Sequence, residues 1–213
     1  MNELTKRILT SLLLLIILYI ALSNTLFLLI VLLIIIYILI NEFNNILKKI
    51  LKYKKILHVL SLFFVISYLY YFSIYIYLFL SSQNQNNLIL FVYILSICIS
   101  TDIGGYVFGK IFKGKKLTKI SPNKTYSGLF GSFFLSILVS IVFFRDLNLF
   151  ENYLIVTIIL SFLSQTGDLI VSFLKRKAKL KDTGLFLPGH GGLLDRLDGI
   201  LLTVPIGILI ISL

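Results

Sequence analysis

The segment from Gln165 to Gly199 reads QTGDLIVSFLKRKAKLKDTGLFLPGHGGLLDRLDG, and the rest of the chain is best interpreted outward from it. It begins inside one apolar stretch and ends inside another, with a basic, glycine-rich loop between them. Its carboxylates are Asp168, Asp182, Asp195 and Asp198. Carboxylates interleaved with lysine and arginine at a membrane edge indicate a hard metal ion that handles phosphates.

The composition predicts an all-α, polytopic integral membrane protein that forms a single membrane domain over residues 1–213. Of its 213 residues, 58% are hydrophobic, and the mean hydropathy is +1.00. Soluble domains are much less apolar, whereas stretches of about twenty apolar residues suit a bilayer core of roughly 30 Å. We expect about seven transmembrane helices, with a range of six to eight. The range reflects residues 8–40, where two helices joined near Ser23–Thr25 fit better than one tilted helix.

The positions of the basic residues predict the orientation of the chain. The expected spans cover residues 8–22, 26–40, 56–80, 88–108, 128–144, 153–174 and about 193–213. With these spans, 19 of the 20 lysines and arginines lie in segments on one side, and Arg145 is the exception. The positive-inside rule then places the glycine-rich loop on the cytoplasmic side of the cell membrane. The same distribution explains the net charge of +11 without nucleic-acid binding.

A shift in composition separates residues 1–87, interpreted as scaffold helices, from residues 88–213, interpreted as the catalytic half. All 13 glycines lie at or after Gly104. The pair Gly105 and Gly109 has the spacing of a helix-packing face. The single Cys98 excludes a disulfide within the chain.

Asp168 is a charge within an otherwise apolar segment. Such a group costs about 2.5–3.5 kcal/mol on insertion scales and is a functional candidate by default. Polar residues recur around it at steps of three and four, and therefore share one helical face that we expect to point into the bundle: Ser161, Ser164, Gln165, Ser172 and Lys175. The alternative is that Asp168 simply pairs with Lys175 and holds helices together.

Asp195 and Asp198 are three residues apart, so they share a face in the first turns of a helix that begins near Leu193. Together with Asp168 they could converge on one Mg²⁺ ion, which proteins typically hold with one or two carboxylates plus phosphate oxygens and water. The alternative for one of the two is stabilisation of the helix N-terminus.

The loop before that helix holds candidate phosphate contacts. Glycines such as Gly191 and Gly192 let backbone amides approach phosphate closely, and a helix N-terminus favours anions. His190 could donate to a phosphate, or it could be a structural histidine in a tight turn. The basic candidates that could neutralise a triphosphate are Lys175, Arg176 and Lys181, with Asp182 and Arg196 as further loop candidates.

These motifs resemble a known family. The string Ser172-x-x-Lys175-Arg176, Lys181-Asp182, Pro188-Gly189-His190-Gly191-Gly192 and Asp195-Arg196-x-Asp198 resembles the signature of the phosphatidate cytidylyltransferases, also called CDP-diacylglycerol synthases. Upstream, Ser121-Pro122-Asn123-Lys124-Thr125-x-x-Gly128 resembles the family's S-P-x-K-T-x-x-G element. The family commonly has Lys at the position of Asn123 and Glu at that of Ser127. Asp102 with its following glycines resembles a D-x-G-A-Y-x-x-G pattern. The resemblance makes Ser121, Lys124, Thr125 and Asp102 candidate substrate contacts.

The resemblance implies transfer of a cytidylyl group from CTP to phosphatidate, with Mg²⁺ and potentially a second cation. It also implies that Asp168 and Asp195 are the metal ligands, with Asp198, Lys175 and Arg176 in the catalytic set. A phosphate monoester is largely a dianion at neutral pH, so its attack needs no general base. The alternatives are a related enzyme acting on another lipid, such as a CDP-archaeol synthase or a polyprenol kinase-like protein, and a membrane transporter. The oligomeric state is open, with a homodimer as one alternative.

Overall fold

A computed structural model describes residues 3–82, 84–118, 121, 124–144, 153–184, 186–188 and 191–212. Within these ranges the fold contains helices and two isolated bridges, Lys116 with Thr125 and Leu187 with Gly191. The helices are α1 (Glu3–Ser23), α2 (Thr25–Leu51), α3 (Lys55–Ser81), α4 (Gln85–Phe112), α5 (Tyr126–Phe144), α6 (Tyr153–Lys177) and α7 (Leu194–Ser212). The predicted all-α fold with seven helices is confirmed. Asn123, Arg145 and His190, which the sequence analysis named, lie outside the described residues.

Helices α1 to α6 are each long and apolar enough to cross a bilayer. The 28 residues of α4 extend about 42 Å at 1.5 Å per residue, more than the roughly 30 Å hydrocarbon core. Helix α7 differs because its first turns carry charges at Asp195, Arg196 and Asp198, and its apolar part begins only at Gly199. The chain is therefore a multi-pass membrane protein.

The break that divides residues 8–40 into two helices is a helix cap. Asn24 has an extended backbone, and its side chain accepts hydrogen bonds from the N–H groups of Leu26 and Phe27 at 3.0 and 3.1 Å. An asparagine in this position satisfies donors that the first turn of α2 would otherwise leave unpaired. The predicted pair of helices is confirmed. However, α2 also continues through the polar segment that follows its apolar part and ends only at Leu51.

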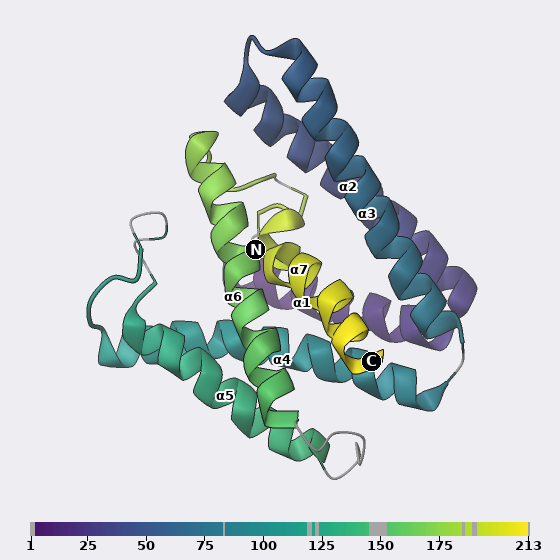
Figure 1. Cartoon of the computed structure of the whole chain (residues 1–213), viewed down its shortest axis with the longest axis vertical. Coiled ribbons are helices and arrows are strands. Elements are labelled where there is room, and N and C mark those ends of the chain that lie inside the picture. Colours follow the sequence, from purple (N-terminus) through teal and green to yellow (C-terminus); the bar gives the residue numbers. More distant parts are fainter. Residues whose placement is uncertain are drawn as a thin grey trace. The chain divides into compact units, whose positions relative to one another are not determined.

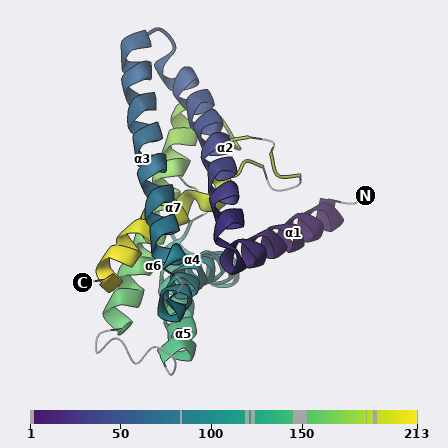
Figure 2. The same cartoon turned by 90° about the vertical axis from the view of Figure 1, so that its right-hand side faces the viewer.

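The chain divides into two compact units, which we describe separately. The first unit comprises Met1–Leu88 and Leu174–Leu197, and thus contains α1, α2, α3, the glycine-rich loop and the first turn of α7. The second comprises Ile89–Phe173 and Asp198–Leu213, with α4, α5 and most of α6 and α7. In the first unit α2 and α3 run side by side along their length (Figure 1), and α1 leads into the start of α2 (Figure 2).

Glycines bring α4 and α5 of the second unit into close contact, and α5 runs alongside α4 in Figure 1. A Cβ atom added to Gly128 would lie 2.6 Å from the carbonyl oxygen of Gly105, and one added to Gly109 would lie 3.6 Å from the Cα of Gly128. Small residues allow helix backbones to approach in this way within membranes. The packing face predicted for Gly105 and Gly109 is thus present.

Buried hydroxyl groups link α4 to α5 and α6. Ser132 donates to the carbonyl oxygen of Thr101 at 2.7 Å, and Thr101 donates to Ser161 Oγ at 2.9 Å. Tyr93 and Thr157 share a further hydrogen bond of 2.8 Å. Ser161 and Ser164 are completely buried, so the polar face of α6 points into the bundle, as the sequence predicted.

Candidate functional site

Asp195 anchors the glycine-rich loop to the start of α7. Its Oδ1 accepts from Lys175 Nζ at 2.7 Å. Its Oδ2 accepts from the backbone N–H of Thr183 at 2.8 Å, the Thr183 hydroxyl at 3.0 Å and the N–H of Gly192 at 3.1 Å. The ammonium group and the two backbone N–H groups fit an ionised carboxylate, and the single Thr183 hydroxyl proton is shared between Asp195 and Glu42. Asp195 thereby connects the end of α6 and two points of the loop to the first turn of α7; the alternative of stabilising the helix N-terminus stays a prediction.

Glu42 of α2 is a second carboxylate in the same network, and the sequence analysis missed it. Its side chain is 5% exposed. Its Oε2 accepts from the Thr183 hydroxyl at 2.7 Å and from the N–H of Leu194 at 2.8 Å, and its Oε1 accepts from the N–H of Leu193 at 2.9 Å. These two amides belong to the unpaired donors at the N-terminus of α7, where negative charge is favourable.

A signal for Glu42 was present in the sequence. It is the only acidic residue between Glu3 and Asp102, and only Asn41 separates it from the apolar run that ends at Ile40. The same reasoning that identified Asp168, a costly charge at the edge of an apolar segment, applies to it. Residues 1–87 therefore contribute a side chain to the loop that carries the signature motifs.

The glycines of the loop are required by its packing on Glu42. A Cβ atom on Gly192 would lie 2.7 Å from Glu42 Oε2 and would also collide with the Thr183 hydroxyl. One on Gly184 would lie 2.6 Å from Glu42 Oε1. Gly191 has φ +87°, a conformation that side chains disfavour. The close approach of Gly191 and Gly192 to phosphate stays a prediction.

The remaining loop candidates are open to solvent. Lys181 and Asp182 are exposed and line a pocket together with residues of α2. Arg176 and Arg196 are also exposed, at the end of α6 and in the first turn of α7. Their roles toward substrate stay predictions.

A cluster of charges in the second unit is centred on Asp168. Lys124 forms an ion pair with its Oδ2, and Ser172 donates to its Oδ1 at 3.2 Å. The carboxyl group of Asp198 lies within hydrogen-bonding reach of Asp168, and Asp102 is near enough to act electrostatically on Asp198. Within the second unit Asp168 therefore has Lys124 as its ion-pair partner, and the alternative in which it pairs with Lys175 stays open.

The connection between α4 and α5 positions Lys124. The N–H of Leu117 donates to the carbonyl oxygen of Lys124 at 2.8 Å, which pairs the two sides of the connection. The N–H of Lys124 donates to the carbonyl oxygen of Ser121 at 3.1 Å. Thr125 Oγ1 accepts from the N–H of Gly128 at 3.1 Å and caps α5. Of the three candidates in this motif, Lys124 reaches the carboxylate cluster and Thr125 forms a helix cap.

The donor set in the second unit fits a magnesium ion. Among the described residues no group of three or more His, Cys, Asp or Glu side chains converges as a complete metal site. Two adjacent carboxylates, from Asp168 and Asp198, are nevertheless the number that Mg²⁺ commonly uses when phosphate oxygens and water complete its shell. A metal shared by Asp168 and Asp195 stays a prediction.

The comparison with known proteins decides the family. The model of the cytidylyltransferase family matches residues 6–213. The chain belongs to this family. It is 46% identical over 110 residues to a phosphatidate cytidylyltransferase of Staphylococcus epidermidis (strain ATCC 35984), a match that covers 50% of this chain and 42% of the relative.

Two further relatives carry the same name. The protein of Staphylococcus haemolyticus (strain JCSC1435) is 48% identical over 110 residues, covering 50% of this chain and 42% of its own length. The protein of Staphylococcus aureus (strain COL) is 44% identical over 119 residues, covering 54% of this chain and 46% of its own length. In each comparison the match spans less than half of the relative.

Proposed function

We propose that this member of the cytidylyltransferase family transfers the cytidylyl group of CTP to phosphatidate, giving CDP-diacylglycerol and pyrophosphate. The observation that carries the proposal is the identity of 44% to 48% with relatives named phosphatidate cytidylyltransferase. The paired carboxylates and basic loops described above are the groups that such a reaction needs.

In the proposed reaction a phosphate oxygen of phosphatidate attacks the α-phosphorus of CTP. A new P–O bond forms, the bond from the α-phosphorus to the oxygen bridging to the β-phosphate breaks, and pyrophosphate leaves with the bond's electrons. Since the attacking phosphate monoester is largely a dianion at neutral pH, the protein does not have to remove a proton. Its tasks are to hold two anionic substrates in line and to neutralise their charge.

The side chains of the chain divide these tasks. Asp168 and Asp198 would hold Mg²⁺, with Asp195 as the further ligand that the resemblance implies. The ion would supply positive charge to the phosphate oxygens. Lys124, which pairs with Asp168, would contact a phosphate at that ion. The basic residues of the loop, Lys175, Arg176 and Lys181, would contact the departing pyrophosphate.

The site would lie on the cytoplasmic side of the cell membrane. This proposal rests on the 19 of 20 basic residues assigned to one side and on the positive-inside rule. At that surface a water-soluble nucleotide and a lipid head group can meet.

The test is turnover by the purified protein in detergent, with Mg²⁺, phosphatidate and CTP labelled in the cytidine or in the γ-phosphate. We expect the cytidine label to enter the lipid extract with an equal amount of pyrophosphate released. Transfer of the γ-label to a lipid would show a kinase instead. Cytidine transfer to isoprenoid phosphates but not to phosphatidate would show the related enzyme class. Labelling of neither lipid would refute the proposal.

A further inference from the structure

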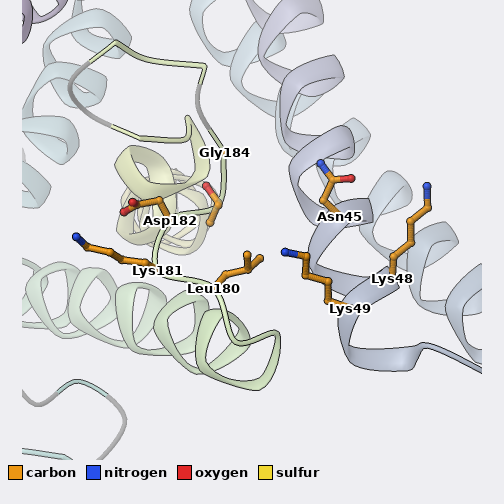
Figure 3. Close-up of a pocket in the computed structure, with 8 residues that line it drawn as sticks. Asn45, Lys48, Lys49, Leu180, Lys181, Asp182 and Gly184 are labelled. Carbon is orange, nitrogen blue, oxygen red and sulfur yellow. The ribbon is translucent and has the colours of Figure 1, made fainter.

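A pocket of about 540 Å³ lies in the first unit, between the C-terminal turns of α2 and the loop that follows α6 (Figure 3). Helix α2 contributes Asn45, Lys48 and Lys49, and the loop contributes Lys181, Asp182 and Thr183. The sequence analysis assigned no role to the α2 residues, because it treated this helix as scaffold.

The two walls of the pocket are tied together by the buried carboxylate of Glu42. Asn45 and Lys49 follow Glu42 by three and seven residues, so all three lie on one face of α2. Thr183, on the opposite wall, donates its hydroxyl to Glu42 at 2.7 Å and is 4% exposed. Since a buried hydrogen bond fixes one wall to the other, the pocket is a built feature and not a chance gap between surface lysines.

The charge of the pocket suits an anion. Its lining includes three lysines and one carboxylate, that of Asp182. Lys49 extends from α2 toward the loop in Figure 3, while Lys48 and Lys181 point outward on exposed, flexible stems that can reorient around a bound ligand. Basic residues in the last turn of a helix also interact favourably with its dipole. That effect accounts for the charge of Lys48 and Lys49 but not for a fixed opposite wall.

We propose that this pocket binds a phosphate group of the substrate, with Lys49 and Lys181 as direct contacts from opposite walls and Lys48 as a supporting charge. The inference rests on the proposed function and deepens it, since it adds α2 to the substrate-binding surface. Both substrates carry phosphate: CTP as a triphosphate and phosphatidate as a monoester. The shared chemistry defines the ligand, and kinetics distinguish its source.

The experiment compares the double variant Lys48→Gln/Lys49→Gln with Lys52→Gln/Lys55→Gln. The control removes two charges from the same basic segment, but neither Lys52 nor Lys55 lines the pocket. Each purified protein is assayed with CTP varied at saturating phosphatidate, and then with phosphatidate varied at saturating CTP. We expect the pocket variant to raise KM for one substrate by about tenfold or more, the size expected from losing a hydrogen bond to a charged group. The control should stay within about twofold of wild type.

The substrate whose KM rises identifies the source of the phosphate. Unchanged KM values for both substrates would overturn the proposal, and so would an equal rise in the control, which would show a general surface potential.

A binding measurement separates this inference from the proposed function. Inorganic pyrophosphate should raise the thermal stability of wild type and of the control, and should raise that of the pocket variant clearly less. This result would support the pocket even if wild type made no CDP-lipid. Equal stabilisation of all three proteins, or of none, would refute the pocket as a phosphate site.

Discussion

Replacing Glu42 by glutamine should loosen the junction between the glycine-rich loop and α7 while leaving the helices folded. In the structure one oxygen of Glu42 accepts two hydrogen bonds, from Thr183 and Leu194, and the other accepts one, from Leu193. Glutamine has a single acceptor oxygen. Whichever way its amide turns, its NH₂ group faces at least one backbone N–H, and the bonds that remain go to a neutral acceptor.

The magnitude follows from these bonds. A buried donor left without a partner costs about 1–3 kcal/mol, and bonds to a charged acceptor exceed bonds to a neutral one by about 1 kcal/mol. We therefore expect about 3 kcal/mol of local destabilisation, which corresponds to roughly a hundredfold in the opening equilibrium. Amide exchange of the first turn of α7 reports this opening directly.

The assay is hydrogen–deuterium exchange by mass spectrometry on the purified protein, together with turnover. Peptides covering residues 191–199 should exchange roughly a hundredfold faster in Glu42→Gln, while peptides from α5 should be unchanged. Thr183→Val, which removes one hydroxyl shared by Glu42 and Asp195 but leaves the two backbone bonds to Glu42, should give an intermediate effect. Turnover should fall in the same order. Exchange within about threefold of wild type, together with normal turnover, would refute the reasoning that Glu42 holds the loop.

Three further predictions concern the aspartates, the loop glycine and the topology. Asp168→Asn should nearly abolish turnover with normal folding, because Asp168 is a proposed magnesium ligand, and a near-normal rate at saturating Mg²⁺ would contradict this; Asp195→Asn should lower turnover and also speed amide exchange of the loop, because Asp195 holds the loop through its hydrogen bonds. Gly192→Val should abolish turnover because a Cβ there lies 2.7 Å from a Glu42 oxygen, and more than a tenth of wild-type activity in the inserted protein would show that the loop can give way. Cysteines introduced at Asn84 and Lys115 should be labelled from opposite sides of the membrane, and labelling from the same side would overturn the span order.

The helices could be predicted from the sequence because each depends on a run of apolar residues long enough to cross a bilayer. The start of α2 could be placed near Asn24, because the polar residues Ser23, Asn24 and Thr25 interrupt the apolar run. In the structure Asn24 caps the helix. The end of α2 could not. Its polar continuation from residue 41 to 51 has the composition of a loop and is helical in the structure, where Glu42 and Ile46 are buried.

Site residues divide in the same way. Local motifs identified Asp168, Asp195 and the loop glycines, because spacing along one helix or one turn is visible in the sequence. The partners of these residues lie far along the chain. Glu42 is 141 residues from Thr183, and Lys124, which precedes α5, pairs with Asp168 in α6. In a single sequence, the available signal for such pairings is that a charge near an apolar segment is energetically costly. This signal identifies a residue as a candidate but does not identify its partner.

The hydrogen-bond partners of the carboxylates indicate which of them a metal ion would serve best. Glu42 and Asp195 accept hydrogen bonds from six protein donors, with the Thr183 hydroxyl directed at both carboxylates, so both are already stabilised by the protein. Asp168 and Asp198 approach each other instead: Asp168 pairs with the Lys124 ammonium and accepts from the Ser172 hydroxyl, and Asp198 accepts from the N–H of Gly199. A divalent cation could interact with both of these neighbouring carboxylates at once. The carboxylates of the first unit therefore shape the loop, and the paired carboxylates of the second unit are the ones that a magnesium–nucleotide complex would suit best.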